Sequence, residues 1–277
     1  MVTTTTAGPA APGGGGRHRH RYVDLSLTIE PTPSEPVPTV IDRVGHAEGA
    51  DILGGPAGIG RAEFPGGLGL SLEHVRLTTH TATHVDAPAH YGPQCEGRRA
   101  RTIDELPLEW FHGPGVLLDC RGESTEPVDV DEVRARLSQA EHELAPGDIV
   151  LIDTDAARLW GRPEYFTDFR GVTRAATRFL VESGVKVIGV DSFGFDPPFH
   201  RMLADWAATG DPAVLWPAHI YGREREYCQI ERLANLSAIG RPTGFEVACF
   251  PIKIKDAGAG WARVVAIVPE EPSPCRA

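Results

Sequence analysis

The sequence lacks the features of a membrane or secreted protein. No apolar run approaches the ~20 residues that a helix needs to cross a bilayer. The first segment, MVTTTTAGPAAPGGGG, lacks the charged start and apolar stretch of a signal peptide. No Cys-x-x-Cys pair is present, which argues against a disulfide scaffold or a thiolate-ligated zinc site. We therefore expect a protein of the reducing cytoplasm without a membrane partner. The five cysteines are Cys95, Cys120, Cys228, Cys249 and Cys275.

Clustered positive charge is also scarce. The net charge is −11, with 27 Lys and Arg against 38 Asp and Glu, and the one basic block is RHRHR at residues 17–21. Nucleic-acid binding needs grouped Lys and Arg to neutralise phosphates. The composition therefore argues against a nucleic-acid partner.

What is present fits one globular domain between two tails. The chain has 277 residues, of which 41% are hydrophobic and 23% charged, and this is enough to bury a sizeable core. Residues 1–20 are rich in Gly, Pro and Thr and predict a disordered tail. Residues 21–270 show no internal repeat and no second boundary, so we expect a single domain there, followed by a C-terminal tail over 271–277.

Short runs rich in Val and Ile alternate with amphipathic segments. Val130, Val133 and Leu137 predict one helix, and the apolar stripe over 172–180 predicts a second that ends near Gly184. Strands alternating with helices indicate an α/β domain. The predicted strands cover residues 21–29, 115–120, 148–153, 185–191, 246–254 and 262–268.

A Pro-rich and then Gly-rich stretch separates the first strand from the rest. We interpret residues 31–70 as a long excursion, because loops of this length are usually functional or disordered. The sequence GGPAGIG within it is similar to a phosphate-binding loop. No Lys-Ser/Thr follows, so a nucleotide site is not indicated.

The stretch LTTHTATHVDAPAHYG, from Leu77 to Gly92, concentrates metal-capable side chains. Its Thr and Val residues favour a strand, and Pro88 opposes a helix. Alternate side chains of a strand share a face, so two histidines and the aspartate would point one way with the small Ala82 between them. The turn at the proline could bring a third histidine to the same pocket. The four residues are His80, His84, Asp86 and His90.

Such a set without thiolates suits Zn, Mn or Fe(II). Further ligands should come from elsewhere in the chain, and the candidates are His200, His219 and the acidic residues of HIYGREREYCQIE. Among these we favour His219 and Glu231. The alternative is that these side chains are surface residues or are satisfied within the core.

The segment HTATHVDAPAH at residues 80–90 resembles the His-x-Gly-Thr-His-x-Asp-x-Pro-x-His signature of the cyclase family of metal-dependent hydrolases. That family includes kynurenine formamidase, isatin hydrolase and ring-closing cyclases of aromatic polyketides. The similarity extends through VDLSLTI, RTIDELPLEWFHGPGVLLD, LAPGDIVLIDT, GVKVIGVDS and IERLANLSAI, over about residues 22–269.

The resemblance implies a swivelling β/α/β domain with a central, barrel-like mixed sheet and flanking helices, assembled as a homodimer or homotetramer. It also implies one or two divalent ions, Zn or Mn, held by His80, His84 and Asp86. In this family His90, His219 and Glu231 line the other side, where they serve as acid and base. In binuclear members such residues hold a second ion, so His90 and Glu231 are also candidate ligands.

Two positions depart from the family pattern. The signature Gly is Ala82 here, which is small enough for metal binding to survive. The hydrolase segment Thr-Gly-Trp is TDAARLW, with Asp155 where Gly is usual, and this puts formamidase specificity in doubt. Insertions at 45–70 and in FGFDPPFHRMLADWAATGDPAVLWPAHIYG add aromatic residues that could line a substrate pocket or merely pack the insertion. We select Phe195, Trp216 and Tyr221 as substrate-binding candidates.

From these features we expect a metal-dependent cyclase that closes a ring on an aromatic polyketide by aldol condensation and loss of water. The alternative is an amide or lactam hydrolase of the formamidase or isatin type. Both reactions need a cation that stabilises an oxyanion beside a general base, so the ligands alone do not choose between them. A catalytically silent metal-binding scaffold is the third possibility.

Overall fold

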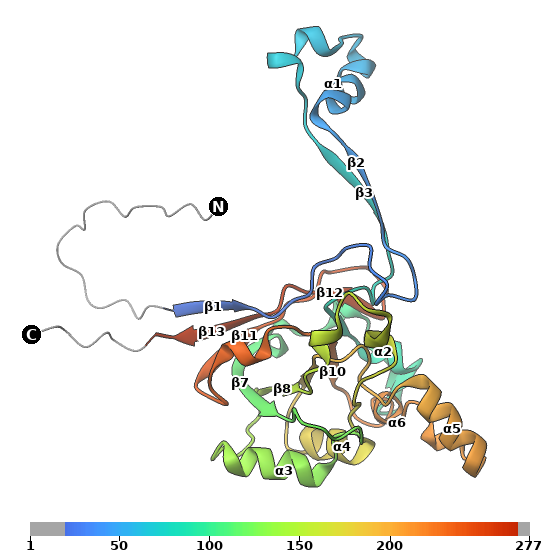
Figure 1. Cartoon of the computed structure of the whole chain (residues 1–277), viewed down its shortest axis with the longest axis vertical. Coiled ribbons are helices and arrows are strands. Elements are labelled where there is room, and N and C mark those ends of the chain that lie inside the picture. The colour runs from blue at the N-terminus through green and yellow to red at the C-terminus, as the bar shows by residue number, and fades with distance from the viewer. Residues whose placement is uncertain (1–19, 271–277) are drawn as a thin grey trace, which may run out of the picture.

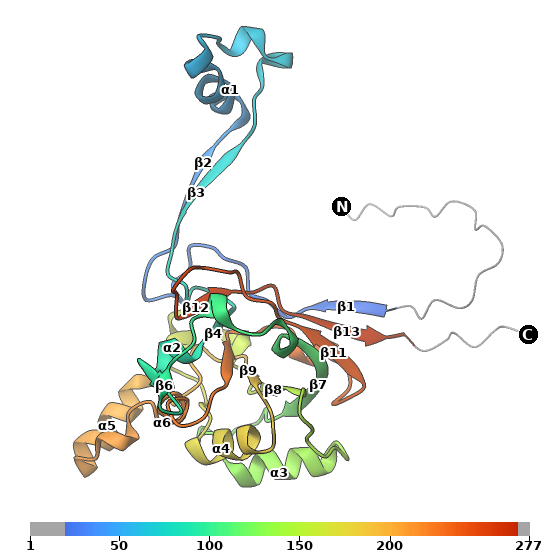
Figure 2. The same cartoon turned by 180° about the vertical axis from the view of Figure 1, so that it is seen from behind.

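The computed structural model describes residues 20–270 (Figures 1 and 2). The tails predicted over 1–20 and 271–277 therefore lie outside the described residues, apart from His20, which begins the first strand. Within the described part of the chain, no helix is long and apolar enough to cross a bilayer.

The centre of the molecule is one curled, nine-stranded mixed sheet. Strands β7 to β10 run parallel, and the outer strands pair antiparallel. This arrangement confirms the predicted α/β fold with a barrel-like mixed sheet. In spatial order the strands are β1 (His20–Asp24), β13 (Val265–Pro269), β11 (Phe245–Ala248), β7 (His112–Asp119), β8 (Ile149–Asp153), β9 (Val187–Val190), β10 (Cys228–Glu231), β4 (His84–Asp86) and β12 (Ala259–Trp261).

Helices flank the sheet on its convex side and at one end (Figure 1). Helices α3 and α4 pack against the parallel strands, and α4 also packs against α6. Asp129 and Thr173 cap α3 and α4 through their side chains. The helices outside the insertion at 45–70 are α2 (Pro88–Tyr91), α3 (Val130–Gln139), α4 (Arg174–Glu182), α5 (Phe199–Thr209) and α6 (Pro217–Tyr221).

The two faces of the sheet bury different clusters. On β8, Ile149 and Leu151 point into the curl of the sheet, whereas Val150 and Ile152 pack under α3 and α4. All four side chains are almost completely buried. Burial on both faces explains why the parallel strands read as continuous apolar runs.

The predicted strands differ from the observed ones mainly at their ends. The strand predicted over 246–254 ends at Ala248 as β11. Pro251 has no N–H to donate to a ladder, and it makes only an isolated bridge, with Ala262.

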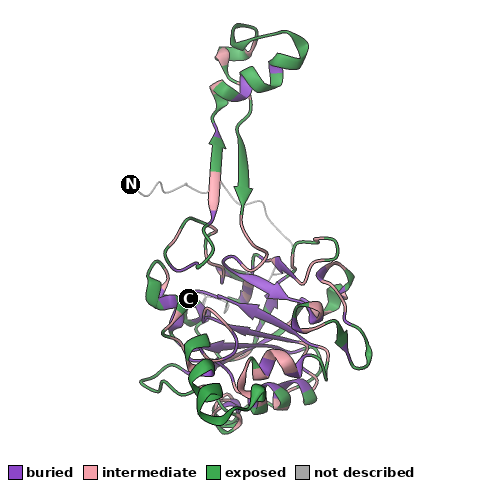
Figure 3. Ribbon diagram, turned by 90° about the vertical axis from the view of Figure 1, so that its right-hand side faces the viewer, coloured by how far each residue is buried: buried purple, intermediate pink, exposed green. Residues whose placement is uncertain are grey.

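The excursion predicted over 31–70 contains regular structure that the sequence did not indicate. Strands β2 (Val40–Val44) and β3 (Leu72–Arg76) form an antiparallel ribbon, and α1 (His46–Gly54) with three short 3-10 turns forms its tip. We call residues 40–76 the arm. It projects from the body (Figures 1 and 2) and is almost entirely exposed (Figure 3). A further short hairpin joins β5 (Gln94–Cys95) and β6 (Arg98–Arg99).

Candidate metal centre

Strand β4 provides the centre of the site, with His84 and Asp86 fully buried. The strand predicted to include His80 begins only at His84. Residues 79–83 form a turn instead, in which Ala82 has a φ of +53°. The shared orientation of the three ligand-type side chains therefore comes from a reversal of the chain and not from alternation along a strand.

That reversal places His80 against the two residues of β4. The His80 Nδ1 atom lies 3.0 Å from Oδ1 of Asp86 and 3.2 Å from Nε2 of His84. The His84 Nε2 atom lies 3.5 Å from the same Asp86 oxygen. His84 Nδ1 faces the carbonyl of Ala82 at 2.8 Å, so Nε2 is the atom turned toward the site.

A second group forms on the other side of Asp86. His90 lies on α2 and His219 on α6, and one ligand atom from each lies within 4.8 Å of an Asp86 oxygen and of the other. The His219 Nε2 atom is 3.9 Å from Oδ2 of Asp86. Asp86 therefore belongs to two groups of three, as a carboxylate that bridges two ions would.

Glu231 completes the set predicted from the sequence. It ends β10, which pairs antiparallel with β4 so that Glu231 lies opposite His84. Its Oε2 is 3.5 Å from His84 Nε2, and its Oε1 is 3.8 Å from His219 Nε2. Oε1 also accepts a hydrogen bond from the backbone N–H of Phe195 at 2.8 Å, which orients the carboxylate. The structure thus brings all six predicted metal and catalytic residues together.

The residues fit a divalent cation. Both carboxylate oxygens of Asp86 are buried without a hydrogen-bond donor of normal geometry, and such a group normally needs a partner. Imidazole and carboxylate donors without thiolates suit zinc or manganese. The geometry accommodates one ion at His80, His84 and Asp86, and a second at Asp86, His90 and His219.

Burial and the neighbouring charges shift the pKa values of Asp86, His90 and His219 in different directions. Burial raises the pKa of Asp86, but His90, His84 and His80 outweigh it and hold that pKa well below its usual range. Burial lowers the pKa of His90, and its charged neighbours do not restore it. Burial also lowers the pKa of His219, but the hydrogen bond to Asp196 and nearby carboxylates raise it to about 9.

Asp196 is a functional residue that the sequence did not reveal. Its Oδ2 lies 2.5 Å from Nδ1 of His219, and its two oxygens also accept the backbone N–H groups of Ala218 and His219. A carboxylate on Nδ1 leaves Nε2 of His219 facing Asp86 and Glu231. Nothing in the local sequence distinguishes Asp196 from any other loop aspartate.

A buried ion pair supports the turn that holds His80. Nη1 of Arg232 lies 2.7 Å from both carboxylate oxygens of Glu35, and Oε1 of Glu35 accepts the N–H of Ala82 at 2.8 Å. Arg232 also donates to the carbonyl of Phe193 and lies over its ring. Glu35 comes from the stretch predicted to be a long loop, so its role could not be predicted.

A cavity of about 230 Å³ opens beside the metal-capable residues. Of the predicted substrate-binding residues, Phe195 and Trp216 line it. Tyr221 does not line the cavity. Its ring is buried beside Tyr227, and the guanidinium of Arg174 lies over the same ring. Phe193 and Phe199, two other aromatic residues of the predicted insertion, also line the cavity, whereas nothing in the sequence indicated the lining residues Phe166 and Phe169.

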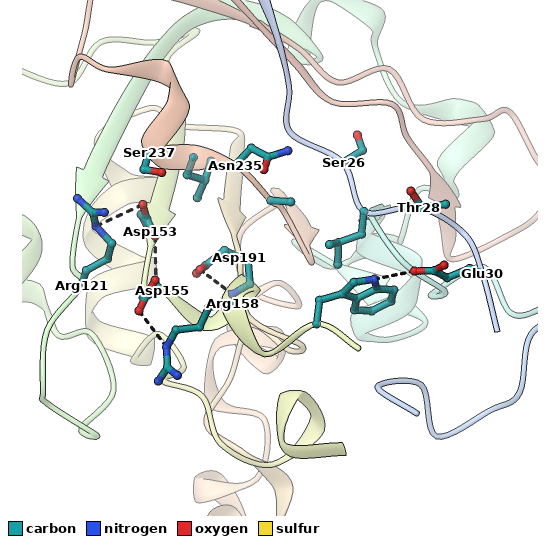
Figure 4. Close-up of a pocket in the computed structure, with 15 residues that line it drawn as sticks. Ser26, Thr28, Glu30, Arg121, Asp153, Asp155, Arg158, Asp191, Asn235 and Ser237 are labelled. Carbon is teal, nitrogen blue, oxygen red and sulfur yellow. Dashed lines mark hydrogen bonds and ion pairs between the residues drawn. The ribbon is translucent and has the colours of Figure 1, made fainter. Parts of the chain in front are cut away.

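Asp155 lies away from this cavity. It adopts a left-handed conformation with a φ of +66°, which explains a preference for Gly at this position and which Asp tolerates. Its side chain pairs with Arg158 at the rim of a separate cavity of about 510 Å³, which Asp153 and Asp191 also line (Figure 4). The substitution therefore gives no reason to doubt hydrolase activity.

Comparison with known proteins agrees with the geometry. Residues 23–197 match the family described as "Putative cyclase". Kynurenine formamidase of Salinibacter ruber is 28% identical over 214 residues, which cover 74% of this chain and 82% of that protein.

Solved structures are similar in fold. Isatin hydrolase A from Ralstonia solanacearum aligns with a TM-score of 0.70 at 24% identity, covering 90% of this chain and 92% of that chain. A structure described as a potential metal-dependent hydrolase with cyclase activity aligns with a TM-score of 0.58 at 21% identity, covering 92% and 100%. The family match covers more than half of the chain, so this protein belongs to the cyclase family, an enzyme family that includes hydrolases.

Proposed function

We propose that this enzyme is a metal-dependent hydrolase that opens an amide or lactam bond in a small aromatic substrate. The observation that carries the proposal is the buried Asp86 carboxylate, shared by two groups of histidines beside a cavity walled by aromatic rings. The names of the relatives, kynurenine formamidase and isatin hydrolase, favour this reaction over the polyketide ring closure that we expected from the sequence.

In this proposal His80, His84 and Asp86 hold the catalytic ion. A divalent ion held by these residues would supply Lewis acidity for a carbonyl and would lower the pKa of water at the site. Glu35 and Arg232 keep the turn that carries His80 in place. The aromatic rings hold the flat substrate and exclude water from it.

Proton transfer falls to the residues across the cavity. His90 opens on the cavity and stays neutral near pH 7 because burial lowers its pKa, so it can accept a proton from the attacking water. His219, with a raised pKa and its Nδ1 held by Asp196, can return a proton to the departing nitrogen. Glu231 lies within 4 Å of His84 and His219, and its negative charge stabilises the protonated form of His219.

The size of the cavity favours a small substrate. Pockets for drug-sized ligands usually measure ~300–1,000 Å³, whereas this one measures about 230 Å³. A monocyclic or bicyclic aromatic amide fits such a space. A long, multi-ring polyketide chain would need the cavity to open, so ring closure is the second candidate.

The test is turnover of N-formylkynurenine and of isatin by protein loaded separately with zinc and with manganese, followed by absorbance. We expect hydrolysis of at least one substrate. His84→Ala should lose both metal and turnover, and His112→Ala, which removes an exposed histidine outside the site, should lose neither. If metal-loaded wild-type protein hydrolyses neither compound, the hydrolase proposal is wrong and ring closure becomes the better account.

A further inference from the structure

A larger cavity lies away from the metal-capable residues, at the carboxyl ends of the parallel strands. It measures about 510 Å³, against about 230 Å³ for the cavity beside the metal centre, and the two share no described lining residue. In α/β proteins, ligands commonly bind at the carboxyl ends of parallel strands. We call it the strand-end cavity. Its ionisable lining residues are Glu30, Arg121, Asp153, Asp155, Arg158 and Asp191 (Figure 4).

Two buried carboxylates lie side by side in this cavity. Asp153 ends β8, and Asp191 follows directly after β9. The two strands pair in parallel with Ile152 opposite Val190, so the next residue of each lies at the same edge of the sheet. The side chain of Asp153 is 7% exposed, and Asp191 is 1% exposed. Neighbouring carboxylates so far from bulk water are stable as anions only with a positive charge close by.

The two arginines of the cavity are already paired with other carboxylates. Arg121 donates through Nε and Nη2 to Asp119 at 2.8 and 2.6 Å, and Nε of Arg158 lies 2.9 Å from Asp155. The Nε atom of Arg121 lies 3.6 Å from Oδ2 of Asp153, which is beyond hydrogen-bond distance. The cavity therefore keeps an excess of negative charge at its two buried carboxylates.

The two carboxylates differ in their remaining hydrogen-bond capacity. Oδ1 of Asp191 accepts the N–H and the hydroxyl of Thr154 at 2.8 and 2.7 Å, and its Oδ2 accepts the N–H of Ala157 at 3.1 Å. Oδ1 of Asp153 accepts the N–H of Asp155 at 3.1 Å. Among the described residues, no donor reaches Oδ2 of Asp153 within hydrogen-bond distance. A side chain that is more than nine-tenths buried and that lines the cavity thus keeps an acceptor without a partner.

Other lining groups suit a compact cation with an apolar body. Asn235 donates through Nδ2 to the carbonyl of Asp24 at 2.9 Å, which leaves its Oδ1 as an acceptor, and Ser237 adds a hydroxyl. Trp160 adds an aromatic ring, whose Nε1 donates to Glu30 at 3.2 Å. Aromatic rings attract cations at their faces. The apolar lining residues are Leu27, Ala157, Trp160, Ala234 and Leu236.

We propose that the strand-end cavity binds a small organic amine in its ammonium form, with the ammonium at Asp153 and the carbon body against Trp160. An ammonium has three donors, and the cavity offers acceptors on Asp153, Asn235 and Ser237. Burial and then the charge of Asp191 raise the pKa of Asp153 to about 6, and burial also raises the pKa of Asp191. A cation bound between these groups stabilises their ionised forms.

The lining groups argue against other classes of ligand. A metal ion would find both oxygens of Asp191 already bound by N–H and O–H donors. In the part of the chain that the structure describes, the groups of three or more side chains able to hold a metal are the two that share Asp86. An anion would meet two buried carboxylates and arginines that are already paired. The size of the cavity lies within the ~300–1,000 Å³ usual for small organic ligands.

The experiment is titration calorimetry of the metal-free full chain with benzylamine and with phenethylamine, near pH 7 and at constant ionic strength. We expect at least one amine to bind with a Kd below ~1 mM. Benzyl alcohol has the same ring without the charge and should bind at least ~10-fold more weakly. Asp153→Asn keeps the shape of the side chain and removes its charge, so it should raise the Kd of the amine at least ~10-fold.

Two control variants locate the binding. Asp131→Asn is the matched control, because Asp131 is 86% exposed on α3 and lies outside the cavity. Trp216→Ala changes the lining of the cavity beside the metal centre and would weaken the amine if it bound there. We expect neither variant to change the Kd. Asp153→Asn removes a buried charge, and urea unfolding would verify that its loss of binding does not come from loss of the fold.

Three results would overturn the proposal: neither amine binds below ~10 mM, benzyl alcohol binds as tightly as the amines, or Asp153→Asn binds them as tightly as the wild type. Displacement of a bound amine by magnesium or calcium chloride at the same ionic strength would identify a metal site and would also overturn it. The proposal goes beyond the hydrolase activity and does not depend on it. None of these readouts uses turnover or metal loading, so failure of the hydrolase proposal would leave them unaffected.

Discussion

Removal of the Glu35 carboxylate should destabilise the protein far more than removal of an ordinary surface carboxylate. Glu35 and Arg232 are 4% and 5% exposed at their side chains, and their pairing leaves little of either charge in water. In Glu35→Ala, Arg232 would stay buried without its counter-charge. The N–H of Ala82 would also lose its acceptor.

The expected magnitude follows from these two losses. Removing one partner of a buried ion pair destabilises a protein by about 3–5 kcal/mol. A buried N–H left without an acceptor destabilises it by about 1–3 kcal/mol. The two losses share the same side chain and do not add fully. We therefore expect the free energy of unfolding to fall by about 3–5 kcal/mol, a large share of the ~5–15 kcal/mol typical of a domain.

The assay is urea unfolding of the metal-free protein, followed by tryptophan fluorescence and circular dichroism. Asp24→Ala is the matched control, because Asp24 makes the same kind of pair with Arg263 at side-chain exposures of 44% and 74%. That exposed pair should contribute about 1 kcal/mol or less. The double variant Glu35→Gln/Arg232→Gln should be more stable than Glu35→Ala, because no charge is left buried without a partner.

A second readout connects the ion pair to the site. Glu35 holds Ala82 in its left-handed conformation, and the same turn positions His80. Glu35→Ala should therefore weaken metal binding by about 10–100-fold, as loss of a supporting contact does at other metal sites, measured by competition with a chelating dye. If Glu35→Ala destabilises the protein no more than Asp24→Ala, or leaves metal affinity unchanged, the assigned role of the pair is wrong.

The other expectations concern single side chains. Asp196→Asn should lower kcat about 10–100-fold, because it removes the carboxylate that orients His219 and raises its pKa, as steady-state assays of the metal-loaded variant would measure. Burial and then the charge of a neighbouring carboxylate raise the pKa of Asp153 from 3.8 to about 6, so in the wild type ionisation lowers stability as pH rises from about 4 to 6. We expect the free energy of unfolding of Asp153→Asn, relative to that of the wild type, to rise by about 1–2 kcal/mol between pH 4 and pH 7, as urea unfolding at the two pH values would measure. Trp216→Ala should raise KM about 10-fold and change kcat little, whereas Tyr221→Phe, outside the cavity, should leave KM unchanged in steady-state assays.

The parallel strands were predictable because burial on both faces leaves a clear pattern. The run at 148–153 became β8 with one residue removed at its start. Gly184 follows the end of α4 and has a φ of +99°, which is why glycine signals a helix end there. The arm was not predictable, because its strands carry charged residues on exposed faces, and the alternation expected of a half-buried strand is absent.

The turn before β4 shows how tertiary contacts override local preference. Four threonines and a valine near His80 favour a strand, yet the hydroxyl of Thr81 accepts the N–H of Thr78 at 3.2 Å and closes a turn. The left-handed residue in this turn is held by Glu35, more than forty positions earlier in the chain. This partner cannot be predicted from the residues next to His80 in the sequence.

The candidate metal ligands could be predicted from the sequence, whereas the residues that hydrogen-bond to them could not. The difference lies in the chemistry of the two sets. Few residue types bind a divalent ion, so a dense group of histidines with an aspartate is informative by itself. Supporting residues such as Asp196 act through ordinary hydrogen bonds that any aspartate can make.

Ala82 and Asp155, the two positions that depart from the family pattern, have the same kind of backbone conformation. Both have positive φ, a backbone conformation in which Gly is preferred. A departure at such a position changes the strain of the backbone by about 1–2 kcal/mol at most, and so it says little about which reaction the site performs.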